Sequence, residues 1–419
     1  MQTPTRTLSV GSPMVNRSCG VLFALGMGLS TETAAGQDVL TEVEVIALAR
    51  ATSPAVQVAR ATEALSRAQA SAAGLMPNPT VSWERETLLT GSNNAQDILR
   101  ASFPIDIARP LTVRSLAASE SAWTRAEAEL DRTRAISEVV LAYYDVVVLE
   151  HRLEVLSHAL QSLEEASRVL ARRESAGTAS GYESTRLGIA TELARSERAL
   201  IDGTLRGARA RLGTMLGIDP AGLRVDTTLT LAALPNEAVL VERATRNQDV
   251  VSHARASVSA AEDAANRAGW TWLPTLSLNG GVNLVDDVGT RYGYVAGVSL
   301  AVPIFDGGAG LRAQADAQEA LSRAREAALA QELRGQVASA YAVYDAARIE
   351  LERFDTATAV GVETLVAAAQ SGYREGQRTI VELLDAQATA TEVAERCLEL
   401  FAAAKRAEVL ARAAAGELQ

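Results

Sequence analysis

Residues 275–285 read TLSLNGGVNLV and residues 292–302 read YGYVAGVSLAV, and these two stretches decide the fold. In both, apolar side chains alternate with small or polar ones, which is the period of a β-strand. Segments of about ten such residues are typical of strands in outer-membrane barrels. Two ordinary hairpins packed on helices are the other interpretation. Aromatic residues stand at the strand ends, where the interfacial belt of a membrane protein lies: Trp270, Trp272, Tyr292 and Tyr294.

A weaker version of the alternating pattern occurs in the first half of the chain, near residues 81–86 and 99–105. The sequence therefore predicts four strands. An open sheet edge is not tolerated in lipid, because its backbone N–H and C=O groups lack partners, and about eight strands are the usual minimum for closure. If the strands cross a membrane, several protomers must share one barrel.

Long helices are predicted for most of the remaining chain. Two segments, near residues 109–176 and 310–372, have no proline in their interior, and at 1.5 Å per residue each makes a rod of roughly 100 Å. Shorter helices are expected at residues 39–75, 182–216, 237–269 and 379–416. The expected fold is mainly α, a long coiled-coil helical barrel with a membrane β-barrel portion of four strands per protomer. The apolar residues recur every three or four positions, for example Leu149, Leu153, Leu156, Leu160 and Leu163.

The chain contains an internal repeat. Phe103-Pro104-Ile105 corresponds to Val302-Pro303-Ile304, and the same shift brings Gly177 onto Gly376 and Glu183 onto Glu382. Each copy has a helix, a strand pair, a very long helix and a last helix. We therefore predict a first repeat at 37–217, a linker at 218–235 and a second repeat at 236–419.

Residues 1–36 have the pattern of a cleaved secretory signal peptide. Arg6 and Arg17 precede an apolar run at 19–29, and small residues follow at 33–36. A run of 11 residues is too short for a membrane-spanning helix, which needs about 20. Because no later apolar run reaches 18 residues, strands are the expected means of crossing a membrane.

Composition argues against several classes of protein. A net charge of −11 over 419 residues is unsuited to nucleic acid, which binds basic surfaces. No HExxH, paired CxxC or Ser/His/Asp context is present, so we predict no catalytic residue, no metal site and no cofactor. The glycines at 307–310 lack the Gly-Lys-Ser/Thr ending of a phosphate loop. The sequence therefore predicts a protein that is not an enzyme.

Three motifs resemble the TolC-type outer-membrane efflux proteins, and the resemblance extends over essentially the whole mature chain. They are MPNPT at 76–80, VPIFDGG at 302–308 and YREGQRTIVELLDAQ at 373–387. The resemblance implies a homotrimer in the outer membrane of a Gram-negative bacterium, with a twelve-strand barrel in the lipid and a twelve-helix tunnel in the periplasm. It implies a periplasmic adaptor (membrane fusion) protein and an inner-membrane pump as partners. The implied function is a passive exit duct of a tripartite efflux system.

Candidate gate residues lie around the turn at 373–387. Glu382 and Asp385 are three apart on the helix after the turn, so they share a face and would form two rings of acid in a trimer. Such rings favour cations. The resemblance implies that Tyr373 and Arg378 take part in the links that close the entrance and that Glu183 is the matching acid of the first tip. An ordinary solvated helix face is the alternative for these acids.

The resemblance also implies docking positions for the adaptor. Its hairpins are expected on Gly177 in the first tip and on Gly376, Gln377, Arg378 and Thr379 in the second, because glycine lets another backbone approach closely. The first tip lacks the Val-Gly-Leu type of sequence, which leaves the adaptor contacts of that half open.

Two alternative functions stay open at the level of sequence. One is the outer-membrane component of type I protein secretion, and the other is a soluble exported coiled-coil structural protein. Residues 77–79 and 176–177 resemble the heavy-metal cation-efflux branch, whereas the GQRT turn is shared with drug-efflux and type I secretion channels. The sequence does not select the cargo.

Overall fold

The computed structural model describes residues 39–73, 75–87, 95–105, 109–175, 180–286, 289–302, 305 and 307–418. The predicted signal peptide at 1–36 and the predicted docking residue Gly177 lie outside the described residues.

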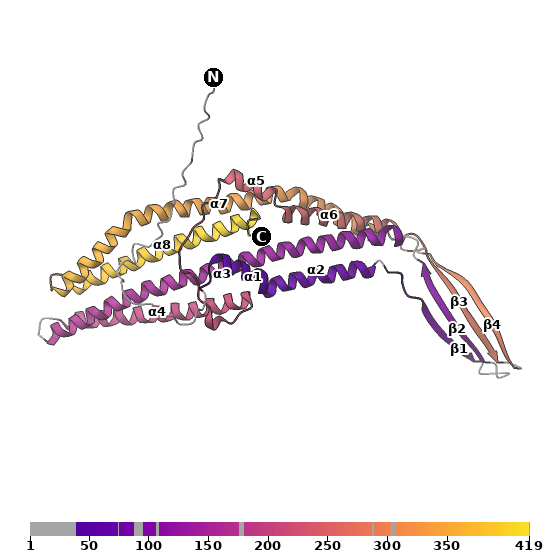
Figure 1. Cartoon of the computed structure of the whole chain (residues 1–419), viewed down its shortest axis with the longest axis horizontal. Helices are drawn as coiled ribbons and strands as arrows, with labels where there is room; N and C mark the ends of the chain where they lie inside the picture. Colours follow the sequence, from indigo (N-terminus) through magenta and orange to yellow (C-terminus); the bar gives the residue numbers. More distant parts are fainter. Residues whose placement is uncertain are drawn as a thin grey trace, which may run out of the picture. The chain divides into compact units, whose positions relative to one another are not determined.

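The described chain is mainly helical and contains four strands, which confirms the expected mainly α fold with four strands per protomer (Figure 1). A helix pair, a strand pair, a very long helix and a shorter helix occur in this order in each half. The elements are α1 (Glu42–Thr52), α2 (Pro54–Ala73), β1 (Thr80–Thr87), β2 (Ala95–Ile105), α3 (Arg109–Ser175), α4 (Gly181–Leu216), η2 (Pro220–Gly222), α5 (Glu237–Thr245), α6 (Gln248–Gly269), β3 (Thr275–Asp286), β4 (Thr290–Ala301), α7 (Ala309–Arg374) and α8 (Ile380–Ala414).

The single helices predicted at 39–75 and 237–269 are each divided in two, so this prediction was wrong. Ser53 ends α1 with an extended backbone (φ −54°, ψ 127°), because a residue before proline disfavours the helical region. Pro54 then begins α2. In the second half Asn247 leaves the helical region and its side chain caps α6 by accepting from the Asp249 N–H at 3.2 Å.

The four strands form one antiparallel sheet in the order β1-β2-β3-β4. Trp83 pairs with Leu99, Leu99 with Val282, and Val282 with Tyr294. These four side chains therefore make an apolar row across one face of the sheet, and they are 64%, 44%, 46% and 88% exposed, respectively. Within the described residues, the outer edges of β1 and β4 have no paired strand.

The chain is divided into two compact units. Among the described residues, the first consists of those within 1–54, 135–241 and 336–419, and the second of those within 55–134 and 242–335. Each unit takes segments from both predicted repeats, so the compact units do not coincide with the repeats. The sheet belongs to the second unit. In the part of the chain that is described, no helix is both long and apolar enough to cross a membrane.

The main core of the first unit lies where α3 meets α1, α4 and α8. Tyr143 and Val147 of α3 pack with Val45 of α1, Leu212 of α4 and Phe401 of α8, and all five are buried. This core holds together the helices that carry the polar side chains of the first unit.

In the second unit, polar contacts join helices beside the sheet. Ser66 Oγ donates to Ser121 Oγ at 3.1 Å, and Trp123 Nε1 donates to His253 Nε2 at 3.2 Å. His253 thus has a packing role, and the α2 and α6 helices are held to the α3 segment of this unit.

Candidate functional site

The turn between α7 and α8 is built by one glycine in the left-handed region. Gly376 has φ +78°, which L side chains rarely adopt. The chain reverses there with two hydrogen bonds to the Gly372 carbonyl, from Gln377 N at 2.8 Å and Arg378 N at 3.0 Å. This geometry satisfies a carbonyl at the end of α7 and fixes the start of α8. The predicted docking residues 376–379 therefore form one compact turn.

Glu382 has a structural role at this turn. The Thr379 N–H donates to Glu382 Oε2 at 2.8 Å, and the Glu382 N–H donates to Thr379 Oγ1 at 3.4 Å, which together make a capping box. Arg378 Nη1 adds an ion pair at 3.4 Å to Glu382 Oε1. The hydrogen bond from the Thr379 backbone and the charge of Arg378 hold the pKa of Glu382 below its usual value. The carboxylate is therefore ionised and held in position.

Glu183 has the same role at the start of α4. Its N–H donates to Ser180 Oγ at 3.4 Å, and the Ser180 N–H donates to Glu183 Oε2 at 3.1 Å. The two acids that the repeat aligns are thus both the third residue of a capped helix. The signal was readable in the sequence as Ser-x-x-Glu at 180–183 and Thr-x-x-Glu at 379–382, and our interpretation of the acids as gate residues overlooked it.

Asp385 lies one helical turn beyond Glu382 on α8, and its side chain is exposed. It takes no part in the capping box. Of the two candidate acids on α8, Asp385 is therefore the one whose charge has no role in the cap.

Tyr373 is buried, with 1% of its surface exposed, in an apolar cluster with Ile380 and Leu383. The Arg173 guanidinium carbon lies 5.6 Å from the centre of its ring, a cation–π contact between α3 and α7. Burial raises the pKa of the Tyr373 phenol. Within this protomer Tyr373 thus packs the base of the turn, whereas Arg378 pairs with Glu382 on the exposed side.

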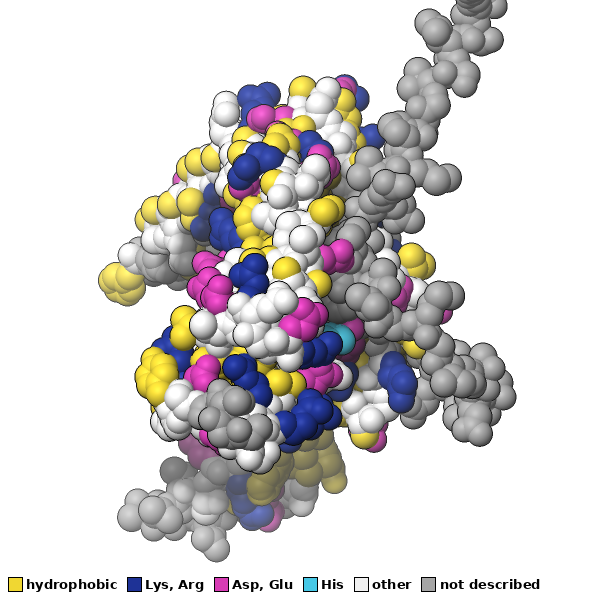
Figure 2. All heavy atoms as spheres, turned by 90° about the vertical axis from the view of Figure 1, so that its left-hand side faces the viewer, with side chains coloured by type: hydrophobic (Ala, Val, Ile, Leu, Met, Phe, Trp, Pro, Cys, Tyr) yellow, Lys and Arg dark blue, Asp and Glu magenta, His cyan; other side chains and the backbone are white. Residues whose placement is uncertain are grey.

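Hydrogen bonds and an ion pair between α3 and the helices α7 and α8 stabilise the region of the turn between α7 and α8. Arg374 Nη2 lies 2.8 Å from Glu165 Oε2, and Ser162 Oγ accepts from Gln387 Nε2 at 2.7 Å and from Gln370 Nε2 at 3.0 Å. Figure 2 views the molecule from the end at which these helices turn, and basic and acidic side chains lie interspersed on it. No local pattern in the sequence indicates these contacts, because they join residues more than 200 positions apart.

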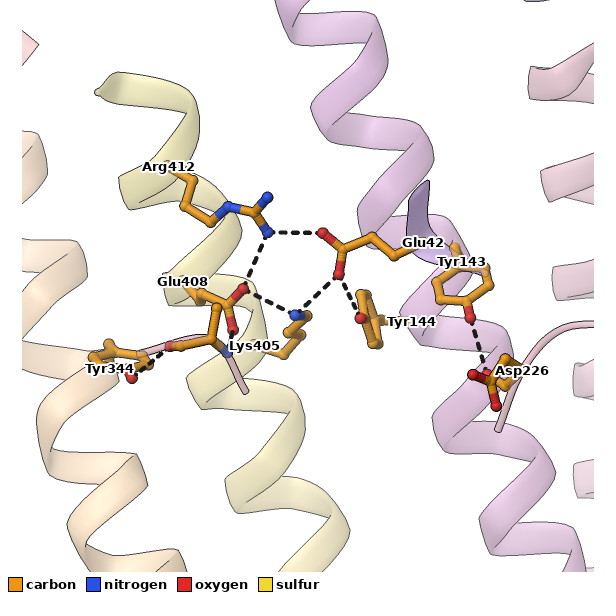
Figure 3. A network of polar contacts seen from close by, with 9 residues as sticks. Glu42, Tyr143, Tyr144, Asp226, Tyr344, Lys405, Glu408 and Arg412 are labelled. Atoms are coloured by element: carbon orange, nitrogen blue, oxygen red, sulfur yellow. Dashed lines mark hydrogen bonds and ion pairs between the residues drawn. The ribbon is translucent and has the colours of Figure 1, made fainter. Parts of the chain in front are cut away.

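A second polar site, which the sequence analysis also missed, is a buried ion network (Figure 3). We define it by Glu42 of α1 and by Lys405, Glu408 and Arg412 of α8. Glu408 is fully buried and Lys405 is 2% exposed. Glu408 Oε1 lies 2.9 Å from Lys405 Nζ and 3.2 Å from Arg412 Nη1. Glu42 lies 3.2 Å from Lys405 and 2.7 Å from Arg412, so two acids compensate two bases.

Hydrogen bonds connect the buried ion network to neighbouring segments. Tyr144 of α3 donates to Glu42 Oε2 at 2.6 Å, and Ala232 N donates to Glu408 Oε2 at 2.9 Å. Burial raises the pKa of Glu42, but the Tyr144 hydrogen bond and the charges of Lys405 and Arg412 outweigh it, so the pKa lies below its usual value. In the sequence, the network is indicated by the spacing Lys-x-x-Glu-x-x-x-Arg at 405–412, which places three charged residues on an otherwise apolar helix face.

Two further tyrosines hold the segment between η2 and α5. Tyr143 donates to the Asp226 carbonyl at 2.9 Å, and Tyr344 donates to the Ala232 carbonyl at 2.8 Å (Figure 3). Together with Glu408 they fix the predicted linker against α3, α7 and α8. The network therefore joins α1, the linker and the last helix.

Comparisons with known proteins agree with this architecture. Residues 240–417 match the family model described as outer membrane efflux protein. Protein CyaE of Bordetella pertussis is 30% identical over 306 residues, and the alignment covers 68% of this chain and 62% of that relative. The chain thus spans less than two thirds of the length of this curated relative.

Solved outer-membrane channels share the fold. The CmeC outer membrane channel of Campylobacter jejuni superposes with a TM-score of 0.73 at 14% identity, covering 98% of this chain and 94% of that one. VceC of Vibrio cholerae gives 0.69 at 17% identity, with 90% and 96% covered. The open-state MtrE channel of Neisseria gonorrhoeae gives 0.68 at 16% identity, with 90% and 89% covered.

Proposed function

We propose that this chain, whose residues 240–417 match the family model described as outer membrane efflux protein, is the outer-membrane exit duct of a tripartite efflux system. In this role it passively conducts substrates from an inner-membrane pump and a periplasmic adaptor to the exterior. The observation that carries the proposal is the exposed apolar row across the four-stranded sheet.

The sheet supports a place in lipid. Trp83 and Tyr294 are 64% and 88% exposed at opposite ends of the row, and such contiguous apolar surface is rare on a soluble monomer. Lipid tails would cover the row, and the aromatic residues at the strand ends suit the interface. The unpaired edges of β1 and β4 would pair with those of neighbouring copies, which supports a homotrimer.

The helices support a periplasmic tunnel. With 67 residues in α3 and 66 in α7, each has a contour length of about 100 Å. In a homotrimer the four long helices of each copy make twelve. Transport energy would be supplied by the pump, and the duct itself would open and close.

The turn between α7 and α8 is the proposed gate and adaptor contact. In a trimer Glu382 and Asp385 would each occur three times around the axis, and the cap keeps the Glu382 carboxylate in one place. Two rings of negative charge attract cations and exclude anions. Residues 376–379, and Gly177 by the repeat, are the proposed docking positions for the adaptor.

Native mass spectrometry and liposome swelling test the proposed function. The mature protein, purified in a mild detergent, is expected to have three times the protomer mass and to make liposomes permeable to small sugars. A heat-denatured sample of the same protein controls for liposome leakage that the detergent causes. A monomer that leaves the liposomes sealed would contradict the proposal and favour a soluble coiled-coil protein.

A further inference from the structure

A groove of about 580 Å³ lies along α3 in the first unit, between α4 and α8. Its walls are mostly apolar, with Leu141, Val148 and Leu149 from α3, Ala208 from α4 and Ala402 from α8. Sites for small organic ligands commonly have this size and an apolar lining with a few polar groups.

The charged residues of the groove are mostly basic. Arg152, Arg211, Lys405 and Arg406 line it from three helices, and Asp145 is the one acidic residue of its lining. The whole chain has 51 acidic residues against 40 basic ones, so this excess of positive charge runs against the composition. A positive groove in an acidic protein concentrates anions.

Several of these basic groups have donors that the described protein leaves unused. Arg152 Nη2 lies 2.8 Å from Glu395 Oε1, but its Nε is buried and has no hydrogen-bond partner among the described residues. In the same described part of the chain, the Arg211 and Arg406 guanidinium groups form no ion pair. Lys405 is different, because the buried ion network already compensates it. A buried donor without a partner is unfavourable and calls for a ligand or water.

The three arginines are spaced along the groove. Arg195 and Arg209 of α4 pair with Glu164 and Glu150 of α3, so α4 runs antiparallel to α3. Gln387 and Glu395 of α8 contact Ser162 and Arg152 of α3, so α8 runs antiparallel to it as well. Following these alignments, Arg211 lies at the level of Val148 and Arg406 at the level of Leu141. The distance along the α3 axis from the level of Leu141, where Arg406 lies, to Arg152 is about 16 Å at 1.5 Å per residue.

We propose that this groove is a binding site for an elongated organic anion with an apolar body and a sulfonate, carboxylate or phosphate head. The head accepts from the Arg211 guanidinium and from the exposed part of the Arg152 guanidinium. The apolar body lies on Leu141 and Leu149 and reaches toward Arg406. The inference goes beyond the exit duct and does not depend on it, because binding is measured on the purified protein without any flux.

Equilibrium dialysis tests the site with two probes that differ in charge. Naphthalene-2-sulfonate is an anion, and naphthalene-2-sulfonamide has nearly the same body and is neutral at pH 7. The full-length mature protein is kept in a neutral detergent, and uptake by protein-free micelles is subtracted. We expect saturable binding of one sulfonate per protomer and at least tenfold weaker binding of the sulfonamide.

Variants identify the groove as the place of binding. Arg211→Gln is expected to weaken sulfonate binding at least fivefold. Arg206→Gln is the matched control, since Arg206 is also on α4, is 73% exposed, and pairs with Asp202 away from the groove. Uptake that does not saturate, equal binding of the two probes, or equal loss in both variants would each overturn the proposal. A groove filled by a second copy of the chain would give no protein-dependent uptake of either probe, which would also overturn the proposal.

Discussion

Replacing Glu408 by alanine is expected to release the linker and α1 from the last helix. The fully buried carboxylate accepts from Lys405 Nζ at 2.9 Å, Arg412 Nη1 at 3.2 Å and Ala232 N at 2.9 Å. Its removal leaves the buried Lys405 and the partly buried Arg412 with Glu42 as their single acid, and it leaves the Ala232 N–H without an acceptor. Breaking a buried ion pair from one side typically costs about 3–5 kcal/mol.

Part of the free energy lost in Glu408→Ala comes from the contact between Glu408 and the linker. The lost hydrogen bond from Ala232 accounts for about 1–3 kcal/mol, which corresponds to roughly fivefold to 150-fold faster amide exchange if the linker opens by itself. Hydrogen exchange of the peptide covering residues 226–234, followed by mass spectrometry on the native protein, measures this change. Glu408→Gln keeps an acceptor for Ala232, so its linker is expected to exchange more slowly than that of Glu408→Ala.

The matched control for this experiment is Glu399→Ala on the same helix. Glu399 is 65% exposed and pairs with Arg396 at 3.2 Å, and such surface pairs contribute about 0–1 kcal/mol. Exchange in the linker should therefore be unchanged. If Glu408→Ala exposed the linker no more than this control does, the buried ion network would not hold the linker, and the reasoning would be refuted.

Three more predictions follow from the gate and the network. The double variant Glu382→Gln and Asp385→Asn keeps an acceptor at the helix cap but removes both charges. The cation preference of the channel should therefore fall and its resting conductance should rise. Unchanged selectivity would assign both acids to a solvated helix face. Gly376→Ala should lower the free energy of unfolding by about 1–2 kcal/mol in thermal unfolding, because alanine disfavours the positive φ of Gly376. Gly361→Ala inside α7 should raise it by up to about 1 kcal/mol. Equal shifts in the two variants would contradict the turn geometry. The pKa of Glu42 is lowered in the fold, so the stability that it contributes is present above its ordinary value of 4.5 and is lost as pH falls through the lower folded value. The free energy of opening of α1, obtained from amide exchange corrected for its intrinsic pH dependence, should therefore fall on acidification below about pH 4.5, and Glu42→Gln should show a smaller change.

The strands and the long helices were predictable because their patterns are local. Alternation at 275–285 and at 292–302 predicted β3 and β4 to within two residues, and the 3.6-residue period predicted α3 and α7 similarly. The breaks at Ser53 and Asn247 were missed, since the apolar period continues across them and only the Pro54 ring and the Asn247 cap interrupt the helix.

The candidate site was predictable only in part. The turn at Gly376 and its neighbours follows from contiguous sequence. The capping roles of Glu183 and Glu382 were also written in the sequence, as spacings of three, but the resemblance directed the interpretation toward the gate. By contrast, the pairing of Glu42 with Arg412 depends on which helices become neighbours, and no local pattern contains that information.

The most direct test of the exit duct is planar-bilayer conductance of the purified mature protein, recorded with different salt concentrations on the two sides. The account predicts discrete steps whose reversal potential shows cation preference, as expected from acids at 382 and 385 around a closed entrance. Protein that never produces steps, or steps that prefer anions, would contradict it.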